Sequence, residues 1–329
     1  MILAGDIGGT KTVIGLFEEA GNRLHAIREG TFSSQSYSML EEILSQFLGS
    51  GSHPSLRVAC FGVAGPVIEG RTKATNLPWE LDERNLATAL CVPQVKLLND
   101  LEAAAYGMLH LEPTDLRVLQ PGLTRKSNIA VIAAGTGLGE AILYWDETRY
   151  HPIATEGGHA DFAPCSDLEV DLLGYLQKEF GHVSYERVLS GPGLFNIYRF
   201  LMARSEVPEP EWLQKRIAEG DPGTVVSEIG LAEEHPLCTE ALELFCSVYG
   251  AEAGNLALKA FAIGGVYVGG GIAPKILPKL QDGTFTRAFA DKGRFADLLR
   301  SIEVKVTLNL RVPLIGAAHY GLKLAEERI

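Results

Sequence analysis

The stretch MILAGDIGGTKTVIGLF (residues 1–17) places a glycine-rich turn between two apolar runs, and it sets the interpretation of the whole chain. The two runs predict the strands of a β-hairpin. Glycine lacks a Cβ atom, so a phosphate could approach the backbone amides of residues 7–9 within hydrogen-bond distance. The hydroxyls of Thr10 and Thr12 and the charge of Lys11 would add contacts. The same residues equally suit an ordinary tight turn, so the stretch alone leaves both interpretations open.

Three standard phosphate-binding motifs are excluded by the sequence. It contains no G-x-x-x-x-G-K-[ST] P-loop. The segment GTGLGE (135–140) does not match G-x-G-x-x-G, and a strand rather than a helix is expected after it, which argues against a Rossmann site. The H-R-D and D-F-G signatures of protein kinases are also absent. Any phosphate must therefore be held by hairpin turns.

Length, charge and cysteine content narrow the class of protein. A chain of 329 residues exceeds the usual size of one hydrophobic core, which favours two domains. A net charge of −12 argues against nucleic acid or an anionic membrane as a partner. The N-terminus does not resemble a signal peptide. The sequence contains no uncharged apolar run of about 18 residues, which is the length that a membrane-spanning helix needs. The five scattered cysteines predict reduced, buried thiols of a cytoplasmic protein, with no zinc site.

The second half of the chain repeats the pattern of the first. Residues 128–158 again read as strand, glycine turn, strand, polar turn and strand. A long helical stretch (238–262) then precedes a strand that ends in glycines, VYVGGGI (266–272). Similar units at this spacing suggest an internal duplication, although any two glycine hairpins look alike. We therefore expect two mixed α/β domains with a cleft between them.

Three glycine segments in this order indicate a phosphate site more strongly than one. Residues 135–137 offer amides and the hydroxyl of Thr136, and Gly270 and Gly271 offer a flat backbone surface. Asp6 ends an apolar strand and cannot contact a phosphate comfortably. It would instead hold Mg²⁺, directly or through water, between its carboxylate and the phosphates.

Seven motifs in order resemble those of bacterial glucokinases, of the actin-like ATPase and sugar kinase superfamily. They are DIGGTKT (6–12), GVAGP (62–66), LLNDLEAAAYG (97–107), AAGTGLGEA (133–141), EGGHADFAP (156–164), YERVLSGPGL (185–194) and VYVGGGIAPK (266–275). The resemblance implies two actin-like (ribonuclease H-like) domains, with ATP in the cleft. The small domain would comprise residues 1–110 and 313–329, and the large domain 111–312. The implied ATP-binding residues are Asp6, Ile7, Gly8, Gly9, Thr10, Lys11, Thr12, Gly135, Thr136, Gly137, Gly270 and Gly271.

Asn99 and Asp100 stand where a strand gives way to a helix. Either residue would also be an ordinary helix N-cap. The resemblance implies that Asn99 binds the sugar and that Asp100 is the catalytic base. This chemistry is sensible, because a sugar hydroxyl must be aligned with the γ-phosphate and must lose its proton. A helix N-terminus would keep the Asp100 carboxylate ionised.

Further sugar ligands are implied at Glu156, His159 and Glu186, with Asn76 as a lesser candidate. Glu186 would otherwise be a solvated helix residue, and Asn76 an ordinary turn residue before a proline. Together with Asp100, Glu156 and Glu186 would place three carboxylates around one substrate. Such a site repels a sugar acid or sugar phosphate but suits the hydroxyl donors of a neutral hexose. The preferred epimer stays open.

The leading hypothesis is therefore a glucokinase that phosphorylates the 6-hydroxyl of glucose with ATP and Mg²⁺. A kinase for fructose or mannose, or a catalytically silent sugar sensor, are the alternatives. Related sugar kinases carry a zinc-binding cysteine cluster after the histidine, whereas HADFAPCSDLE (159–169) has one cysteine, so zinc is not expected. A homodimer is implied by the resemblance alone.

Overall fold

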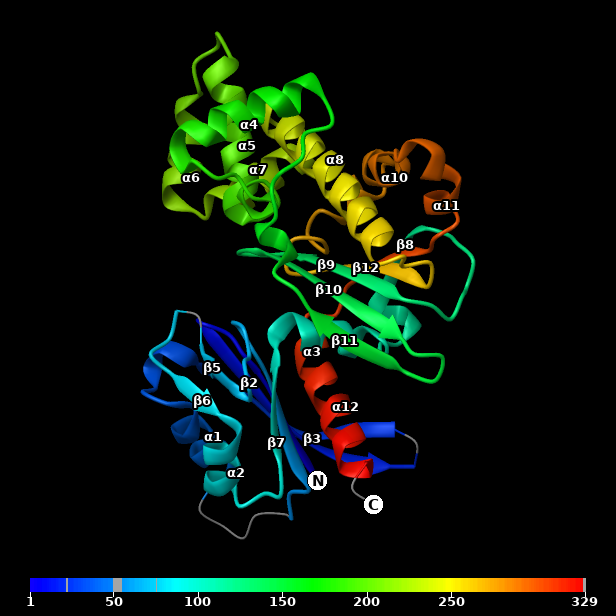
Figure 1. Cartoon of the computed structure of the whole chain (residues 1–329). Helices are drawn as coiled ribbons and strands as arrows, with labels where there is room; N and C mark the ends of the chain where they lie inside the picture. Colours follow the sequence, from blue (N-terminus) through cyan, green and yellow to red (C-terminus); the bar gives the residue numbers. More distant parts are fainter. Residues whose placement is uncertain (22, 50–54, 75, 328–329) are drawn as a thin grey trace. The chain divides into compact units, whose positions relative to one another are not determined.

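The computed structural model describes residues 1–21, 23–49, 55–74 and 76–327 (Figure 1). The chain forms two compact units, and each is an α/β structure, as expected. Unit 1 comprises Met1–Pro113, Tyr150–Ala154 and Asn309–Ile329, and unit 2 comprises Thr114–Arg149 and Thr155–Leu308. That the two units are independent domains stays a prediction.

The sheet of unit 1 begins with the expected hairpin. Its strand order is β3-β2-β1-β4-β7. The first three strands are antiparallel neighbours, and the pairing runs from Ile2 opposite Phe17 to Ile7 opposite Thr12. β4 and β7 lie parallel to β1, so the carboxyl ends of these three strands meet at one edge. The strands are β1 (Ile2–Ile7), β2 (Lys11–Ala20), β3 (Arg23–Ser33), β4 (Val58–Val63) and β7 (Val95–Asn99).

Helices of unit 1 follow their sequence signals. α1 (Leu40–Leu48) buries Leu40, Ile43, Leu44 and Phe47, a stripe at helical spacing. It ends at Gly49, whose φ of 81° is the left-handed conformation that glycine adopts readily. The other strands and helices of unit 1 that precede residue 110 are the 3₁₀ helix η1 (Ser34–Ser36), β5 (Arg71–Lys73), β6 (Glu80–Asp82), α2 (Glu83–Leu90) and α3 (Asp100–Met108).

α12 (Val312–Glu326) runs beside α3 in contact with it (Figure 1, red). Glycines make this approach possible. A Cβ atom added at Gly316 would lie 1.7 Å from the carbonyl oxygen of Ala103, and one at Gly107 would lie 2.2 Å from that of Val312. Because α3 begins at Asp100, this packing also sets the position of that residue.

Replacing Gly316 by alanine should destabilise unit 1 by about 2–3 kcal/mol, because the added methyl group meets backbone that cannot rotate away. Chemical denaturation measures the change. Gly174→Ala in α4 (Asp167–Phe180) is the matched control, since nothing lies within 4 Å of the added carbon there. That variant should gain up to about 1 kcal/mol from helix propensity. Equal stability changes in the two variants would contradict the close packing of α3 and α12.

The six-stranded sheet has the order β11-β10-β9-β12-β13-β8, and all of its strands except β11 belong to unit 2. β9 and β10 form an antiparallel hairpin, β12 is parallel to β9, and β13 is parallel to β12. The run β10-β9-β12-β13 therefore repeats the run β2-β1-β4-β7 of unit 1, which is the pattern that an internal duplication predicts. The strands are β8 (Leu116–Gln120), β9 (Ile129–Ala134), β10 (Leu138–Trp145), β11 (Tyr150–Ala154), β12 (Gly265–Gly269) and β13 (Val304–Thr307).

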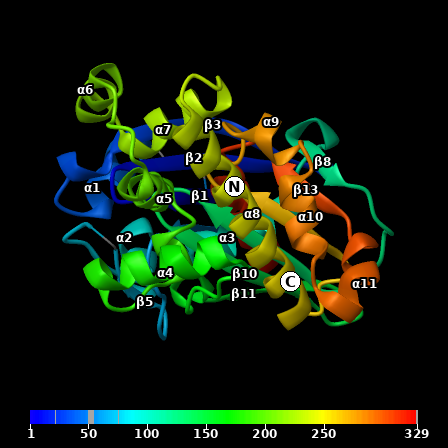
Figure 2. The ribbon, with the colours of Figure 1, turned by 90° about the horizontal axis from the view of Figure 1, so that it is seen from above.

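α8 (Pro236–Lys259) is the central helix of unit 2 and is buried along most of its length. Figure 2 shows it beside α10 (Thr284–Ala290), and added Cβ atoms at Gly250 and Gly254 would collide with carbonyls of that helix. Its Tyr249 hydroxyl accepts a hydrogen bond of 3.1 Å from the backbone N–H of Ala134, at the end of β9. The other helices of unit 2 are α5 (Gly191–Arg204), α6 (Glu211–Glu219), α7 (Pro222–Leu231), α9 (Leu277–Leu280) and α11 (Ala296–Arg300).

The cysteine prediction is only partly right. Cys60, Cys238 and Cys246 are buried, but Cys91 and Cys165 are exposed. Cys91 follows the last turn of α2 in a left-handed conformation, with φ of 52°, and Cys165 lies in the loop before α4. Residue composition alone does not show which loop positions face solvent. Within the described ranges, no helix is long and apolar enough to cross a membrane.

Candidate active site

The first glycine loop is held by a residue that the sequence analysis did not select. Ser34 donates its hydroxyl to the carbonyl oxygen of Gly8 at 2.7 Å, and its backbone N–H bonds the carbonyl of Thr10 at 3.0 Å. The buried hydroxyls of Thr12 and Ser34 lie 2.9 Å apart. Inside the loop, the Gly8 N–H bonds the carbonyl of Lys11 at 3.1 Å. Thr12 therefore fixes the loop from within.

The other loop residues differ in what they can offer a ligand. The side chain of Ile7 is buried in the core, so only its backbone could reach a bound molecule. Gly8 and Gly9 are partly exposed, and the side chains of Thr10 and Lys11 are exposed. The loop thus presents backbone, one hydroxyl and one ammonium group outward.

Asp6 and Asp100 lie close together at the carboxyl edge of the unit 1 sheet. Asp6 is the last residue but one of β1 and lies opposite Gly62 of β4. Gly62 lies opposite Leu98 of β7, and Asp100 follows that strand. Burial and the neighbouring Asp100 carboxylate raise the pKa of Asp6 to about 6, and Lys11 opposes this shift. The structure therefore brings the predicted metal residue and the predicted catalytic base together.

Gly62 makes room for the start of α3. A Cβ atom there would lie 2.8 Å from the Cβ of Ala103 and 3.6 Å from the Cα of Asp100. A larger residue would push the first turn of α3 away from the sheet. The segment GVAGP therefore places Asp100 through close packing.

Asn99 is the N-cap of α3, and its side chain is engaged within the protein. Its side-chain oxygen accepts the backbone N–H groups of Leu101 and Glu102 at 3.0 and 3.4 Å, and Glu102 accepts the N–H of Asn99 at 3.3 Å. These reciprocal bonds form a capping box, whose two residues are the first and last of the sequence NDLE (99–102). The side-chain amide donates to the carbonyl of Gly65 at 3.1 Å and carries a second N–H, which could still reach a sugar.

Asn76 is exposed in unit 1 and has φ of 62°. Asparagine tolerates this left-handed conformation better than most residues, which agrees with the turn interpretation. A contact with a sugar stays a prediction for this residue.

In unit 2, the second glycine turn contacts Glu186. The turn closes the hairpin of β9 and β10, with a hydrogen bond of 2.8 Å from the Gly135 N–H to the Gly137 carbonyl. The Leu138 N–H donates to Oε2 of the partly buried Glu186 at 3.0 Å. A Cβ atom at Gly137 would lie only 2.4 Å from that oxygen. A side chain at Gly137 would therefore displace the Glu186 carboxylate, which the Leu138 N–H holds beside the turn.

The third glycine segment lies against the second. Gly270 has φ of 83°, and a Cβ atom there would lie 2.2 Å from the carbonyl oxygen of Ala134. The same carbonyl accepts the Ile272 N–H at 3.2 Å. The Gly135 carbonyl accepts the N–H of Gly191, the first residue of α5, at 2.8 Å. The second and third segments thus meet beside a helix N-terminus, where backbone N–H groups favour an anion.

Glu156 and His159 lie on a turn packed against β10. A Cβ atom at Gly157 would lie 2.1 Å from Oε2 of Glu140, and one at Gly158 would lie 2.1 Å from the Leu138 carbonyl. The Glu156 and His159 side chains are 65% and 60% exposed, and their nearest charged atoms lie 4.0 Å apart. Both side chains are therefore available to a ligand.

Leu138 connects the predicted sugar residues of unit 2. Its N–H bonds Glu186, and its carbonyl oxygen touches Gly158 in the turn that carries Glu156 and His159. The start of β10 thus positions two separate segments. No sequence pattern marks Leu138, because its role depends on backbone atoms.

The carboxylates of unit 1 fit a magnesium ion that is bound mainly by phosphates and water. In the part of the chain that the structure describes, no group of three or more His, Cys, Asp or Glu residues could hold a metal. Mg²⁺ in phosphate-transfer sites typically takes one or two carboxylates and keeps several waters. Asp6, partly buried beside Asp100, supplies a carboxylate of that kind.

Comparison with known proteins assigns the chain to a family. The family model for glucokinases matches residues 3–324. The chain belongs to the glucokinase family. It is 44% identical to the glucokinase of Nostoc sp. PCC 7120 over 340 residues, covering 98% of this chain and 99% of that protein. The glucokinase of Synechocystis sp. PCC 6803 is also 44% identical, over 343 residues and 96% of both chains.

A solved structure of this family has the same fold. The crystal structure of a glucokinase from an Antarctic psychrotroph superposes with a TM-score of 0.86, at 31% identity and with 98% of both chains covered. The resemblance to glucokinases and the actin-like fold are therefore confirmed for this glucokinase-family chain.

Proposed function

We propose that this glucokinase-family protein transfers the γ-phosphate of ATP to the 6-hydroxyl of glucose, giving glucose 6-phosphate and ADP. The observation that supports this most is the placement of Asp100. It begins α3, directly after the parallel strand β7, and it lies beside Asp6. A carboxylate at the amino end of a helix stays ionised and can accept a proton.

The reaction requires one proton acceptor and one aligned nucleophile. Asp100 would accept a hydrogen bond from the sugar 6-hydroxyl and orient that oxygen in line with the γ-phosphorus. The hydroxyl oxygen forms a bond to phosphorus while the bond between phosphorus and the β,γ-bridging oxygen breaks. The hydroxyl proton passes to Asp100, and ADP leaves with the bridging oxygen.

Asp6 would hold Mg²⁺ through water next to the phosphates of ATP. The ion supplies neutralisation of the charge on the phosphate oxygens. A bound cation would also compensate the repulsion between the Asp6 and Asp100 carboxylates, which adds to burial in raising the pKa of Asp6. Both carboxylates can then stay ionised in the working enzyme.

The nucleotide would be bound by backbone amides from the three glycine segments. Residues 7–12 offer the exposed side chains of Thr10 and Lys11, and Ser34 and Thr12 hold that loop. Gly135, Thr136 and Gly137, with Gly270 and Gly271, offer a second backbone surface, and α5 begins beside it. Phosphate oxygens are acceptors, so donor-rich backbone is the chemistry that they need.

The sugar would be bound by Glu156, His159, Glu186 and Asn99, with Asn76 as a weaker candidate. Glu186 uses one carboxylate oxygen for the Leu138 N–H, so its other oxygen could accept a sugar hydroxyl. Such acceptors discriminate against a sugar whose hydroxyls point elsewhere, because polar groups that the bound sugar covers then lose their partners.

A panel of sugars tests this function. Purified protein with Mg²⁺ and ATP should release ADP rapidly with glucose and at least about tenfold more slowly with fructose, mannose and amino sugars. Faster turnover of another hexose would replace glucose in the proposal. Sugar binding without ADP release would instead identify a silent sensor.

We further propose a cytoplasmic homodimer that serves glycolysis, as the resemblance implies. Sedimentation velocity at micromolar concentration should give about twice the chain mass of 35.5 kDa. A single species at the chain mass would contradict the dimer and leave the catalytic proposal intact.

A further inference from the structure

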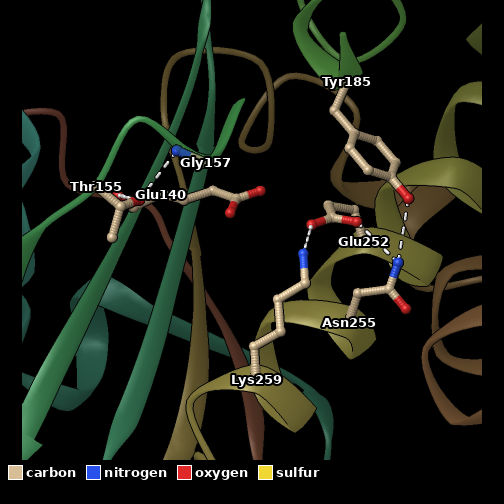
Figure 3. A network of polar contacts seen from close by, with 7 residues as sticks. All are labelled: Glu140, Thr155, Gly157, Tyr185, Glu252, Asn255 and Lys259. Carbon is tan, nitrogen blue, oxygen red and sulfur yellow. Dashed lines mark hydrogen bonds and ion pairs between the residues drawn. The ribbon is translucent and has the colours of Figure 1, made fainter. Parts of the chain in front are cut away.

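A pair of buried carboxyl groups lies outside the predicted ligand residues. Glu140 of β10 is 2% exposed, and Glu252 of α8 is 0% exposed. Figure 3 shows the two side chains pointing toward each other from the sheet and the helix. Burying two carboxylates side by side is unfavourable unless a cation or a proton compensates them.

One oxygen of the Glu140–Glu252 pair lacks a hydrogen-bond donor in the part of the chain that the structure describes. Glu252 accepts from the side-chain amide of Asn255 at 2.8 Å and from the ammonium group of Lys259 at 3.4 Å. Oε1 of Glu140 is buried and has no hydrogen-bond partner among the described residues. Ionised carboxylates can only accept, so one proton between Glu140 and Glu252 supplies the missing donor. With that proton, the two carboxyls and Lys259 sum to zero charge.

Charged and titratable neighbours act on the pair from several elements. Burial and the charge of Glu252 raise the pKa of Glu140 to about 8, while Lys259 opposes the shift. The other titratable groups that feel Glu140 or Glu252 are Tyr185, Tyr249, Cys165 and Lys292.

Glu140 also contacts the turn that carries two of the predicted sugar ligands. Its Oε2 lies where Gly157 leaves space, 2.1 Å from the position of an added Cβ atom. Its carbonyl oxygen accepts the hydroxyl of Thr155 at 2.8 Å, and that hydroxyl oxygen accepts the Gly157 N–H at 3.1 Å. Figure 3 shows Thr155 and Gly157 on the side of Glu140 away from Glu252. A movement of Glu140 must therefore disturb the turn.

We propose that Glu140 and Glu252 share one proton, and that this neutral pair positions the turn 155–159 for sugar binding. Loss of the proton would place two like charges together in the core and drive Glu140 toward Gly157. The sugar-binding part rests on the proposed function, whereas the shared proton and the order of the turn do not. Glu140 is thus a positioning residue with no substrate contact of its own.

Infrared spectroscopy tests the shared proton without any substrate. One pH unit below the Glu140 pKa of about 8, the wild-type protein should show the carbonyl stretch of a protonated, buried carboxylic acid. Above that pKa the band should disappear. Glu140→Gln should abolish the band, and Glu169→Gln should retain it. Glu169 is the matched control because it is also buried in unit 2 but accepts the Cys165 N–H instead. A wild-type spectrum without this band would overturn the shared proton.

The stability of the folded state should report the same proton. With a folded-state pKa of about 8 and an ordinary value of 4.5, the folded chain holds a proton that the unfolded chain releases. This contribution is full below pH 4.5 and is lost as the pH rises toward about 8. The melting temperature of Glu140→Gln, relative to wild type, should therefore rise across this interval. A difference independent of pH would contradict the assignment.

Amide exchange and sugar kinetics test the positioning. Above about pH 8 the wild type should lose protection in residues 155–159, and KM for glucose should rise by about tenfold with little change in kcat. Glu140→Gln should keep both the protection and KM constant across that range, and Glu140→Ala should show the disturbed values at every pH. If wild type and Glu140→Gln shared one pH profile of exchange, the positioning role would be wrong. If exchange changed as expected but glucose did not bind at any pH, the proposed function alone would fail.

Discussion

Asparagine in place of Asp100 should lower kcat for glucose phosphorylation by about 10²–10⁴-fold, the range for loss of a general base. The substitution removes the proton acceptor but preserves the shape of the side chain. It also keeps the oxygen that accepts the Leu101 N–H at 2.9 Å, so α3 should start unchanged. Affinity for ATP should change little. A steady-state assay with an independent nucleotide-binding measurement separates the two effects.

Asp221→Asn provides the control for this experiment. Asp221 also stands at a helix start, where it accepts the Thr224 N–H at 2.9 Å in front of α7. The same chemical change there should leave kcat within about twofold, because an asparagine caps a helix as well as an aspartate. Retention of more than about a tenth of wild-type kcat in Asp100→Asn would refute its role as the base.

Asparagine in place of Asp6 should have opposite effects on activity and on stability. Activity at ordinary Mg²⁺ should fall by about 10²-fold, and a higher Mg²⁺ concentration should restore part of it. The free protein should be as stable as wild type or more stable, because a partly buried charge beside Asp100 has been removed. Magnesium titrations of kcat and thermal denaturation without ligands measure the two responses.

The two measurements on Asp6→Asn separate a metal ligand from a structural residue. Asp82 offers a structural comparison, since it caps α2 by accepting the N–H groups of Arg84 and Asn85. Asp82→Ala should lower stability through loss of the helix cap and leave the magnesium requirement unchanged. Loss of stability in Asp6→Asn together with an unchanged magnesium requirement would show that Asp6 has no role in metal binding.

Features that depend on neighbouring residues could be predicted from the sequence. The hairpin of β1 and β2, the end of α1 at Gly49 and the start of α3 all follow from local patterns of apolar residues, glycines and capping residues. The capping box of Asn99 and Glu102 is also a local pattern, since its two residues stand three positions apart. Local signals therefore accounted for the elements that carry the predicted catalytic residue.

Features that depend on distant pairings could not be predicted. Ser34 bonds Gly8 across the strand hairpin, and Glu186 bonds the backbone of Leu138 from another segment. Glu140 meets Glu252 only because α8 packs against the sheet. Each pairing is set by the tertiary fold. Leu138 takes part through its backbone N–H, which every residue except proline carries, so its side chain does not indicate this role. The residues that hold the predicted ligand residues in place therefore could not be identified from the sequence.

Phosphorus NMR of the reaction products tests the central proposal most directly. Wild-type protein incubated with Mg²⁺, ATP and glucose should yield glucose 6-phosphate as the sugar product, with one ADP formed for each sugar phosphorylated. Asp100→Asn should yield neither product above background on the same timescale. Phosphate on a different hydroxyl, ADP and inorganic phosphate without a sugar phosphate, or unchanged ATP would contradict the account.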